Sequence, residues 1–160
     1  VIVQYMPASD LRGAPVMSSG LTGAQTYARV YAIEPATPAA RGESIAKAAH
    51  GAARVIVATY VRRIEGEGRF AMANPVAQWL DTLATHEHVV VVSFGNPYLL
   101  RQFPSVGSYL VTYGVADVLE QAAADALLGR AAITAHVPVS LPGFFALGDG
   151  IQRDAVAATR

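Results

Sequence analysis

The charged residues of this chain are unevenly spread, and one glycine-bearing segment, Tyr60–Asn74, carries five of them. Charged groups of both signs in one segment can bind a polar ligand or a partner protein. Because charge is scarce elsewhere, this segment is the best candidate for contact with something outside the domain. The alternative is a solvated loop without such a role. The five residues are Arg62, Arg63, Glu65, Glu67 and Arg69.

Two other patterns could support nucleophilic catalysis or metal binding. Ser93 follows an apolar run, as a hydrolase nucleophile would, but Val91 replaces the first glycine of the G-x-S-x-G motif. The alternative for Ser93 is a hydroxyl that satisfies backbone groups at the end of a strand. His86 and His88 could place two metal ligands on one strand face, but no third ligand is evident. We interpret them as a polar connection and predict no metal site.

Length and composition indicate a single packed domain. The chain has 160 residues, about the length of one domain. Hydrophobic residues make up 52% and charged residues 15%, which excludes a disordered chain. Lys+Arg and Asp+Glu number 12 each, which argues against nucleic acid as a main partner. The sequence has no cysteine, hence no disulfide framework, and no apolar run long enough for a membrane span.

Five apolar runs predict the strands that would position these residues. The runs VIVATY and VVVVSF are nearly continuous in apolar character rather than alternating. Strands of a parallel sheet that are buried on both faces have this character. The five runs are Val1–Tyr5, Tyr27–Ile33, Val55–Tyr60, Val89–Phe94 and Tyr109–Tyr113.

Signals for helices lie between the strands. Pro38 and Pro75 each follow a residue that can cap a helix, and Asp117 with Glu120 resembles a capping box. The segment Pro7–Ala24 is rich in glycine and serine, so we expect only a short or irregular crossover there. The alternation of strands and helices predicts a layered α/β domain.

The expected fold is a three-layer α/β/α sandwich with a mostly parallel sheet of about six strands. We assign the sixth strand to His136–Leu141, where Pro138 suits an antiparallel edge strand. Ligands of open parallel sheets bind at the carboxyl ends of the strands, so the site should lie in the loops that begin there. These loops are Tyr60–Asn74, Ser93–Tyr98 and Thr112–Asp117.

Two common functions of such sheets are excluded by the residues at these loops. A phosphate-accepting receiver domain needs a carboxylate at the end of the third strand, where this chain has Thr59 and Tyr60. A nucleotide-binding loop should follow the first strand, but Gly13, Gly20 and Gly23 do not have the G-x-G-x-x-G spacing.

The chain resembles the C-terminal α/β sandwich domain of glycoside hydrolase family 3, most closely the bacterial β-N-acetylhexosaminidase-like members. The resemblance is loose before Val55 and close from Val89 to Ile151. It is carried by VVVVSFGNPYLLRQFPSVGSYLVTYG followed by ALLGRAAITAHVPVSLPGFFALGDGI. Within these segments the combination of GNPYLL, a downstream YG, ALLG and VPVSLP is more specific than any one piece.

The resemblance implies a two-domain enzyme in which an N-terminal TIM-like barrel carries the aspartate nucleophile of a retaining mechanism. Such a mechanism needs two groups about 5 Å apart across the glycosidic bond. Nothing in this chain matches the barrel. We therefore expect residues 1–160 to be a single accessory domain, inactive alone, whose start at Val1 lies inside a longer protein. The expected partners are the barrel and a carbohydrate substrate, with no cofactor.

The resemblance also suggests roles for individual residues. Glu67 matches the acid/base glutamate of the β-glucosidase-like members, whereas the hexosaminidase-like branch has a histidine of the barrel in that role. In the second case Glu67 would be a solvated or substrate-rim residue. Further rim or interface residues would be Arg62, Arg63, Glu65, Arg69, Ser93 and Asn96. The alternatives are a free-standing flavodoxin-like module that binds a ligand or protein, and a serine hydrolase built on Ser93. The cell compartment stays open.

Overall fold

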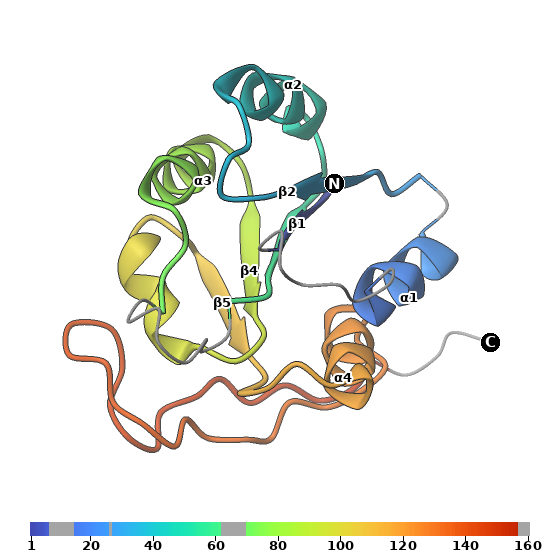
Figure 1. The fold of residues 1–160 in the computed structure, drawn as a ribbon. Helices are drawn as coiled ribbons and strands as arrows, with labels where there is room; N and C mark the ends of the chain where they lie inside the picture. Colours follow the sequence, from blue (N-terminus) through green and yellow to red (C-terminus); the bar gives the residue numbers. More distant parts are fainter. Residues whose placement is uncertain (7–14, 26, 62–69, 157–160) are drawn as a thin grey trace.

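The computed structural model describes residues 1–6, 15–25, 27–61 and 70–156, in which strands and helices alternate (Figure 1). Most strand residues are β-branched, aromatic or otherwise apolar, which favours extended, buried backbone. The strands are β1 (Ile2–Tyr5), β2 (Val30–Ile33), β3 (Val55–Thr59), β4 (Val89–Ser93) and β5 (Ser108–Val111). The helices are α1 (Val16–Ala24), α2 (Ala39–Ala49), α3 (Asn74–His86), α4 (Asp117–Leu127) and the short 3-10 helix η1 (Pro97–Gln102).

The described residues form one sheet of five strands, all parallel, in the order β2-β1-β3-β4-β5. The register aligns Tyr5 with Ile33 on one side and with Thr59 on the other. Thr59 in turn pairs with Ser93, and Ser93 with Val111. The carboxyl ends of neighbouring strands therefore meet at one edge of the sheet.

Helices cover both faces of the sheet, which confirms the three-layer α/β/α sandwich (Figure 1). On one face α2, α3 and η1 bury side chains such as Ile45, Leu80 and Leu99 against β1, β3 and β4. On the other face α1 and α4 bury Met17 and Ala124, among others, against the same strands. Burial on both faces explains why the strand sequences are continuously apolar.

The expected sixth strand is wrong. Residues His136–Leu141 lie outside the sheet and pair with a later segment of the chain instead. Val137 N donates to Asp149 O at 2.7 Å, and Gly148 N donates to Val137 O at 2.9 Å. Pro138 has no N–H to offer a sheet neighbour, which weakens any pairing with β5. Among the described strands β5 is therefore the edge strand on this side.

Residues 129–156 form an extended arm that leaves the end of α4, runs along the side of the molecule that carries β5, and returns (orange to red in Figure 1). Its two halves are antiparallel, with a bridge between Ile133 and Arg153. The chain reverses direction at residues 141–145, where Leu141 N donates to Phe145 O at 2.9 Å. The arm is thus held mainly by its own backbone hydrogen bonds.

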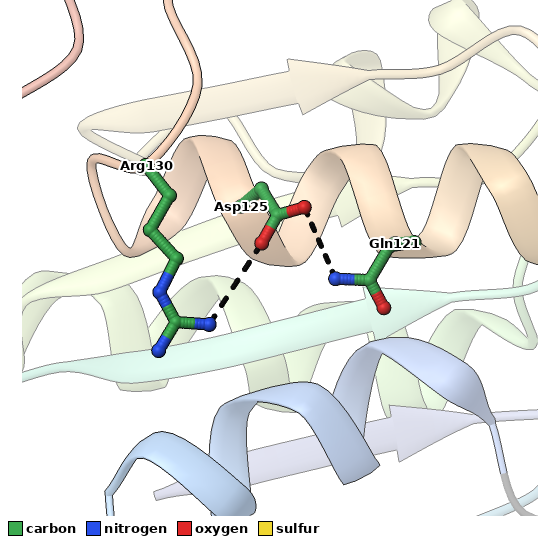
Figure 2. A network of polar contacts seen from close by, with 3 residues as sticks. All are labelled: Gln121, Asp125 and Arg130. Carbon is green, nitrogen blue, oxygen red and sulfur yellow. Dashed lines mark hydrogen bonds and ion pairs between the residues drawn. The ribbon is translucent and has the colours of Figure 1, made fainter.

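Both ends of the arm are fastened at the end of α4. Val156 N donates to Gly129 O at 2.7 Å. Figure 2 shows that Asp125 accepts a hydrogen bond from Gln121 Nε2 at 3.1 Å and lies 3.9 Å from Arg130 Nη1. The ion pair is exposed to solvent, so it adds little stability. Its main effect is on the direction in which the chain leaves α4.

The crossover from β1 to β2 contains a regular helix, α1, where the sequence indicated only a short or irregular one. One of its glycines, Gly20, faces α4, where a Cβ would make an ordinary contact with the Cβ of Ala124 at 3.4 Å. Tertiary packing outweighs the poor helix propensity of this segment. None of the helices in the described ranges is both long and apolar enough to cross a membrane.

Candidate functional site

The three loops singled out in the sequence begin at the carboxyl edge of the sheet, after Thr59, Ser93 and Val111. This is the edge at which open parallel sheets bind ligands. The charged residues of the first loop fall within 62–69 and so lie outside the described residues. They are Arg62, Arg63, Glu65, Glu67 and Arg69.

The chain that enters this loop is fixed by a buried polar and aromatic cluster. The ring of Tyr60 stacks on Phe94, with centroids 4.8 Å apart and an interplanar angle of 12°. The Tyr60 hydroxyl donates to Glu120 Oε2 at 3.1 Å, and Met17 N donates to the same oxygen at 3.2 Å. Glu120 is 3% exposed, so this buried carboxylate joins α4 to α1 and to the residue that follows β3.

The chain that leaves the loop is fixed by two side chains. Gln102 holds the backbone of Met72 at two points: Met72 N donates to its Oε1 at 2.9 Å, and its Nε2 donates to Met72 O at 3.2 Å. Ala73 N donates to the hydroxyl oxygen of Tyr5 at 3.2 Å. The chain that leaves the loop is therefore attached to β1 through Tyr5 and to η1 through Gln102.

Ser93 is completely buried at the end of β4, which places it below the rim rather than on it. Its hydroxyl donates to the carbonyl oxygen of Asn96 at 2.7 Å, and the Tyr109 hydroxyl donates to the same oxygen at 3.1 Å. A serine nucleophile must instead face the substrate and donate to a base. Burial raises the pKa of Tyr109 to about 12, so this hydroxyl stays protonated and can keep donating.

Asn96 connects two of the loops at the carboxyl edge. Its Nδ2 donates to Phe70 O at 2.5 Å, and its Oδ1 accepts from Tyr98 N at 2.9 Å. The preceding residue, Gly95, has φ +118°, a region that favours glycine, and this turns Asn96 toward both neighbours. Asn96 is 5% exposed, so it positions the rim from beneath.

Three aromatic residues that are exposed at this edge were not predicted from the sequence. Phe70, Tyr98 and Tyr113 are large hydrophobic residues with roughly 40 to 50% of their surface exposed. Tyr113 also has a φ of 59°, in the left-handed region that non-glycine residues rarely adopt. The sequence places an aromatic residue in each of three loops that follow neighbouring strands, and loops of this kind often carry function. This pattern could have predicted the three exposed residues.

The histidines lie elsewhere. His50 Nδ1 and Glu87 Oε1 are 3.4 Å apart, next to the chain that enters β4 at the amino edge of the sheet. His86 ends α3 and His88 immediately precedes β4. In the part of the chain that the structure describes, no three His, Asp or Glu side chains are grouped so that they could hold a metal ion.

Parts of three solved structures have a fold similar to that of this chain. A glycoside hydrolase family 3 β-N-acetylglucosaminidase from Paenibacillus sp. str. FPU-7 matches with a TM-score of 0.61 and 15% identity. A fungal multi-domain family 3 β-N-acetylglucosaminidase, which also contains a GCN5-related glucosamine N-acetyltransferase region, matches with 0.67 and 21%. The β-glucoside phosphorylase BglX matches with 0.53 and 14%. No family model and no curated protein matches the sequence.

The matches cover most of this chain but a small part of the other proteins. They span 81%, 93% and 81% of this chain, and 25%, 16% and 23% of the three structures in the same order. The chain therefore spans at most a quarter of the length of each matched structure. The resemblance to the α/β sandwich domain of glycoside hydrolase family 3 is thereby confirmed at the level of the fold.

Proposed function

We propose that this chain is the accessory C-terminal α/β domain of a family 3 glycoside hydrolase, and that the whole enzyme is a β-N-acetylglucosaminidase. The observation that carries the proposal is the coverage: the fold accounts for 81–93% of this chain but for only 16–25% of the matched proteins. The segments GNPYLL and VPVSLP, on which the resemblance noted in the sequence rests, agree with this assignment. The catalytic barrel would then precede Val1 in the same polypeptide.

In this role the domain packs on the barrel, and the loops at its carboxyl edge border the sugar site. The support is the way in which the flanks of the charged loop are fastened, through Tyr60 on one side and through Met72 and Ala73 on the other. A loop held at both ends by rigid elements can present side chains to a neighbouring domain at a defined position. The isolated chain lacks the nucleophile of the barrel and should not turn over substrate.

The coding sequence upstream of Val1 gives the first test, because the proposal requires a barrel there. The second test compares the 160-residue chain with the full-length protein on 4-nitrophenyl N-acetyl-β-D-glucosaminide. We expect hydrolysis by the full-length protein only. A reading frame that begins near Val1, or turnover by the 160-residue chain, would overturn the proposal.

Glu67 can be tested in the full-length protein with Glu65 as a matched control in the same loop. If Glu67 lies at the substrate rim, as we propose, E67Q and E65Q should both change KM by a few-fold and leave kcat nearly unchanged. If Glu67 is the acid/base, E67Q alone should lower kcat by roughly 10²-fold or more. The second result would assign the catalytic proton transfer to this domain.

The strand order favours one other function. The order β2-β1-β3-β4-β5 is that of flavodoxin-like domains. These domains bind their ligand between β1 and β3, where the order of the strands in the sheet reverses. A free-standing module of this kind would bind FMN or another small ligand without any barrel. Titration of the 160-residue chain with FMN tests this function, and saturable binding together with a reading frame that begins near Val1 would favour it.

A further inference from the structure

Two tyrosines and a phenylalanine from three different loops are exposed at the carboxyl edge. Tyr98 is 49% exposed, Tyr113 is 42% exposed and Phe70 is 43% exposed. Tyr98 lies in η1 after β4, Tyr113 follows β5, and Phe70 follows the charged loop. Exposed aromatic residues that gather at one site mark a contact surface, because their burial by a ligand is strongly favourable.

The positions of these aromatic residues are fixed by the scaffold. Asn96 binds the backbone of both Phe70 and Tyr98, so these two residues are held by one buried side chain. Tyr98 and Tyr113 follow β4 and β5, which are neighbouring paired strands of the sheet. Burial and, to a smaller extent, the Tyr98 phenol raise the pKa of Tyr113, in agreement with this placement. A surface whose groups are already in place loses little conformational entropy when it binds.

Tyr113 is held in a strained backbone conformation. Its φ of 59° is one that glycine adopts without cost, and yet the chain has a tyrosine here and the glycine one residue later, at Gly114. Thr112 Oγ1 donates to Gly114 O at 2.8 Å and closes the turn around the tyrosine. Strain of this kind in a bulky residue is found where a side chain must point in a required direction.

We propose that Tyr98 and Tyr113, with Phe70 at their border, form a binding surface for the apolar face of a pyranose ring in a neutral β-linked oligosaccharide. The choice of sugar rests on the proposed function. Because each of the three side chains is only partly exposed, together they offer far less area than the about 800 Å² per partner that a stable protein interface buries, which favours a small ligand.

The chemistry of the surface agrees with an uncharged ligand. Residues 94–100 and 112–116, which form the two tyrosine-bearing loops, contain no charged side chain. The C–H groups of a pyranose face bury apolar area on an aromatic ring, while the phenol hydroxyls can exchange hydrogen bonds with the sugar hydroxyls. A charged ligand would meet no compensating group on these two loops.

The test is calorimetric titration of the 160-residue chain with chitotetraose and, in parallel, with cellotetraose. Weak saturable binding is expected, with Kd roughly in the range of 0.1 to 1 mM. Two variants remove the rings: Y98A, and Y113G, which also relieves the strained φ and should fold at least as well. Each should weaken binding by about tenfold or more. The matched control is Y27A, since Tyr27 is 97% exposed but precedes β2 at the opposite edge.

The proposal is overturned if the chain binds neither saccharide at about 10 mM, or if Y98A and Y113G bind as well as Y27A. Saturable binding that both variants lose supports it, and the preferred saccharide identifies the sugar. The outcome is separate from that of the proposed function. If no barrel precedes Val1 and the chain still binds through Tyr98 and Tyr113, only the domain role fails. If the full-length enzyme is active but the tyrosines do not matter, only the binding surface fails.

Discussion

Asn96 is the residue on which the order of the carboxyl edge depends most. It is buried, and its amide binds Phe70 O and Tyr98 N at the same time. N96A would leave both backbone groups without this partner in a mostly buried position, at a cost of about 1–3 kcal/mol in the free energy of unfolding. Urea unfolding should measure this loss. The control is N74A at the exposed start of α3, where no side-chain cap is made and a change within about 0.5 kcal/mol is expected. Equal stability of the two variants would contradict the role of Asn96.

Tyr109 makes the stability of the protein sensitive to alkaline pH. Burial raises its pKa from 10.0 to about 12 in the folded chain, so the unfolded chain loses this proton first. The stabilising contribution is complete below pH 10 and is lost as the pH rises toward 12, with a magnitude of about 3 kcal/mol at most. The free energy of unfolding, measured in urea from pH 9 to 12, should fall more steeply for the wild type than for Y109F. Parallel pH profiles of the two proteins would show that Tyr109 has no such effect.

At the scale of the elements, two glycines that face a neighbouring helix leave different amounts of room for a side chain. A Cβ at Gly42 on α2 would lie 3.1 Å from two ring atoms of Trp79 on α3, whereas one at Gly20 on α1 would make an ordinary contact with Ala124. G20A should therefore gain about 0.5–1 kcal/mol from helix propensity. G42A should lose that gain to crowding and be less stable than G20A by about 1 kcal/mol or more. Trp79 is the single tryptophan, so its emission should shift in G42A and not in G20A. Unchanged emission in G42A would show that α2 and α3 leave room for the added methyl group next to Trp79.

The strands could be predicted from the sequence because most of their residues are apolar, continuously so in β3 and β4, which are buried on both faces. Each predicted run contains most of an observed strand. The capping box predicted at Asp117 and Glu120, at the start of α4, is wrong. The structure has Ala116 at its N-cap with no side-chain cap, and Glu120 points into the protein, toward Tyr60 and Met17. A capping box and an inward carboxylate have the same local sequence, and only tertiary contacts separate them.

The candidate site was predicted as a set of loops but not as an arrangement of side chains. The position of the loops follows from the parallel sheet, whose carboxyl ends meet at one edge. That Ser93 and Asn96 lie beneath the rim, and that Tyr98 lies on it, depends on the turn at Gly95. Neighbouring residues of one loop can thus be buried or exposed according to a single backbone angle, which composition does not reveal.

At the scale of the whole molecule, the two hydrophobic clusters use residues no later than Leu128, so the sandwich is complete before the arm begins. The arm adds one completely buried apolar side chain, Leu141, while Leu147 and Ile151 are each 70% exposed. Most of the apolar surface of the arm is therefore open to a partner. The core of the sandwich is thus formed by residues up to Leu128. The arm instead exposes apolar side chains that can contact another part of a longer protein.

A chain that ends after Arg130 should accordingly keep the sandwich and unfold cooperatively. It loses the burial of Leu141, which is worth about 2 kcal/mol, but it keeps the network of Asp125 in Figure 2, because Gln121, Asp125 and Arg130 all remain. L141A in the full chain should cost a similar amount, about 2–4 kcal/mol. Equal losses in the two proteins would show that the arm stabilises the sandwich through this one side chain. If instead the shortened chain loses its cooperative transition while L141A keeps it, the arm stabilises the fold through more contacts than those of the Leu141 side chain.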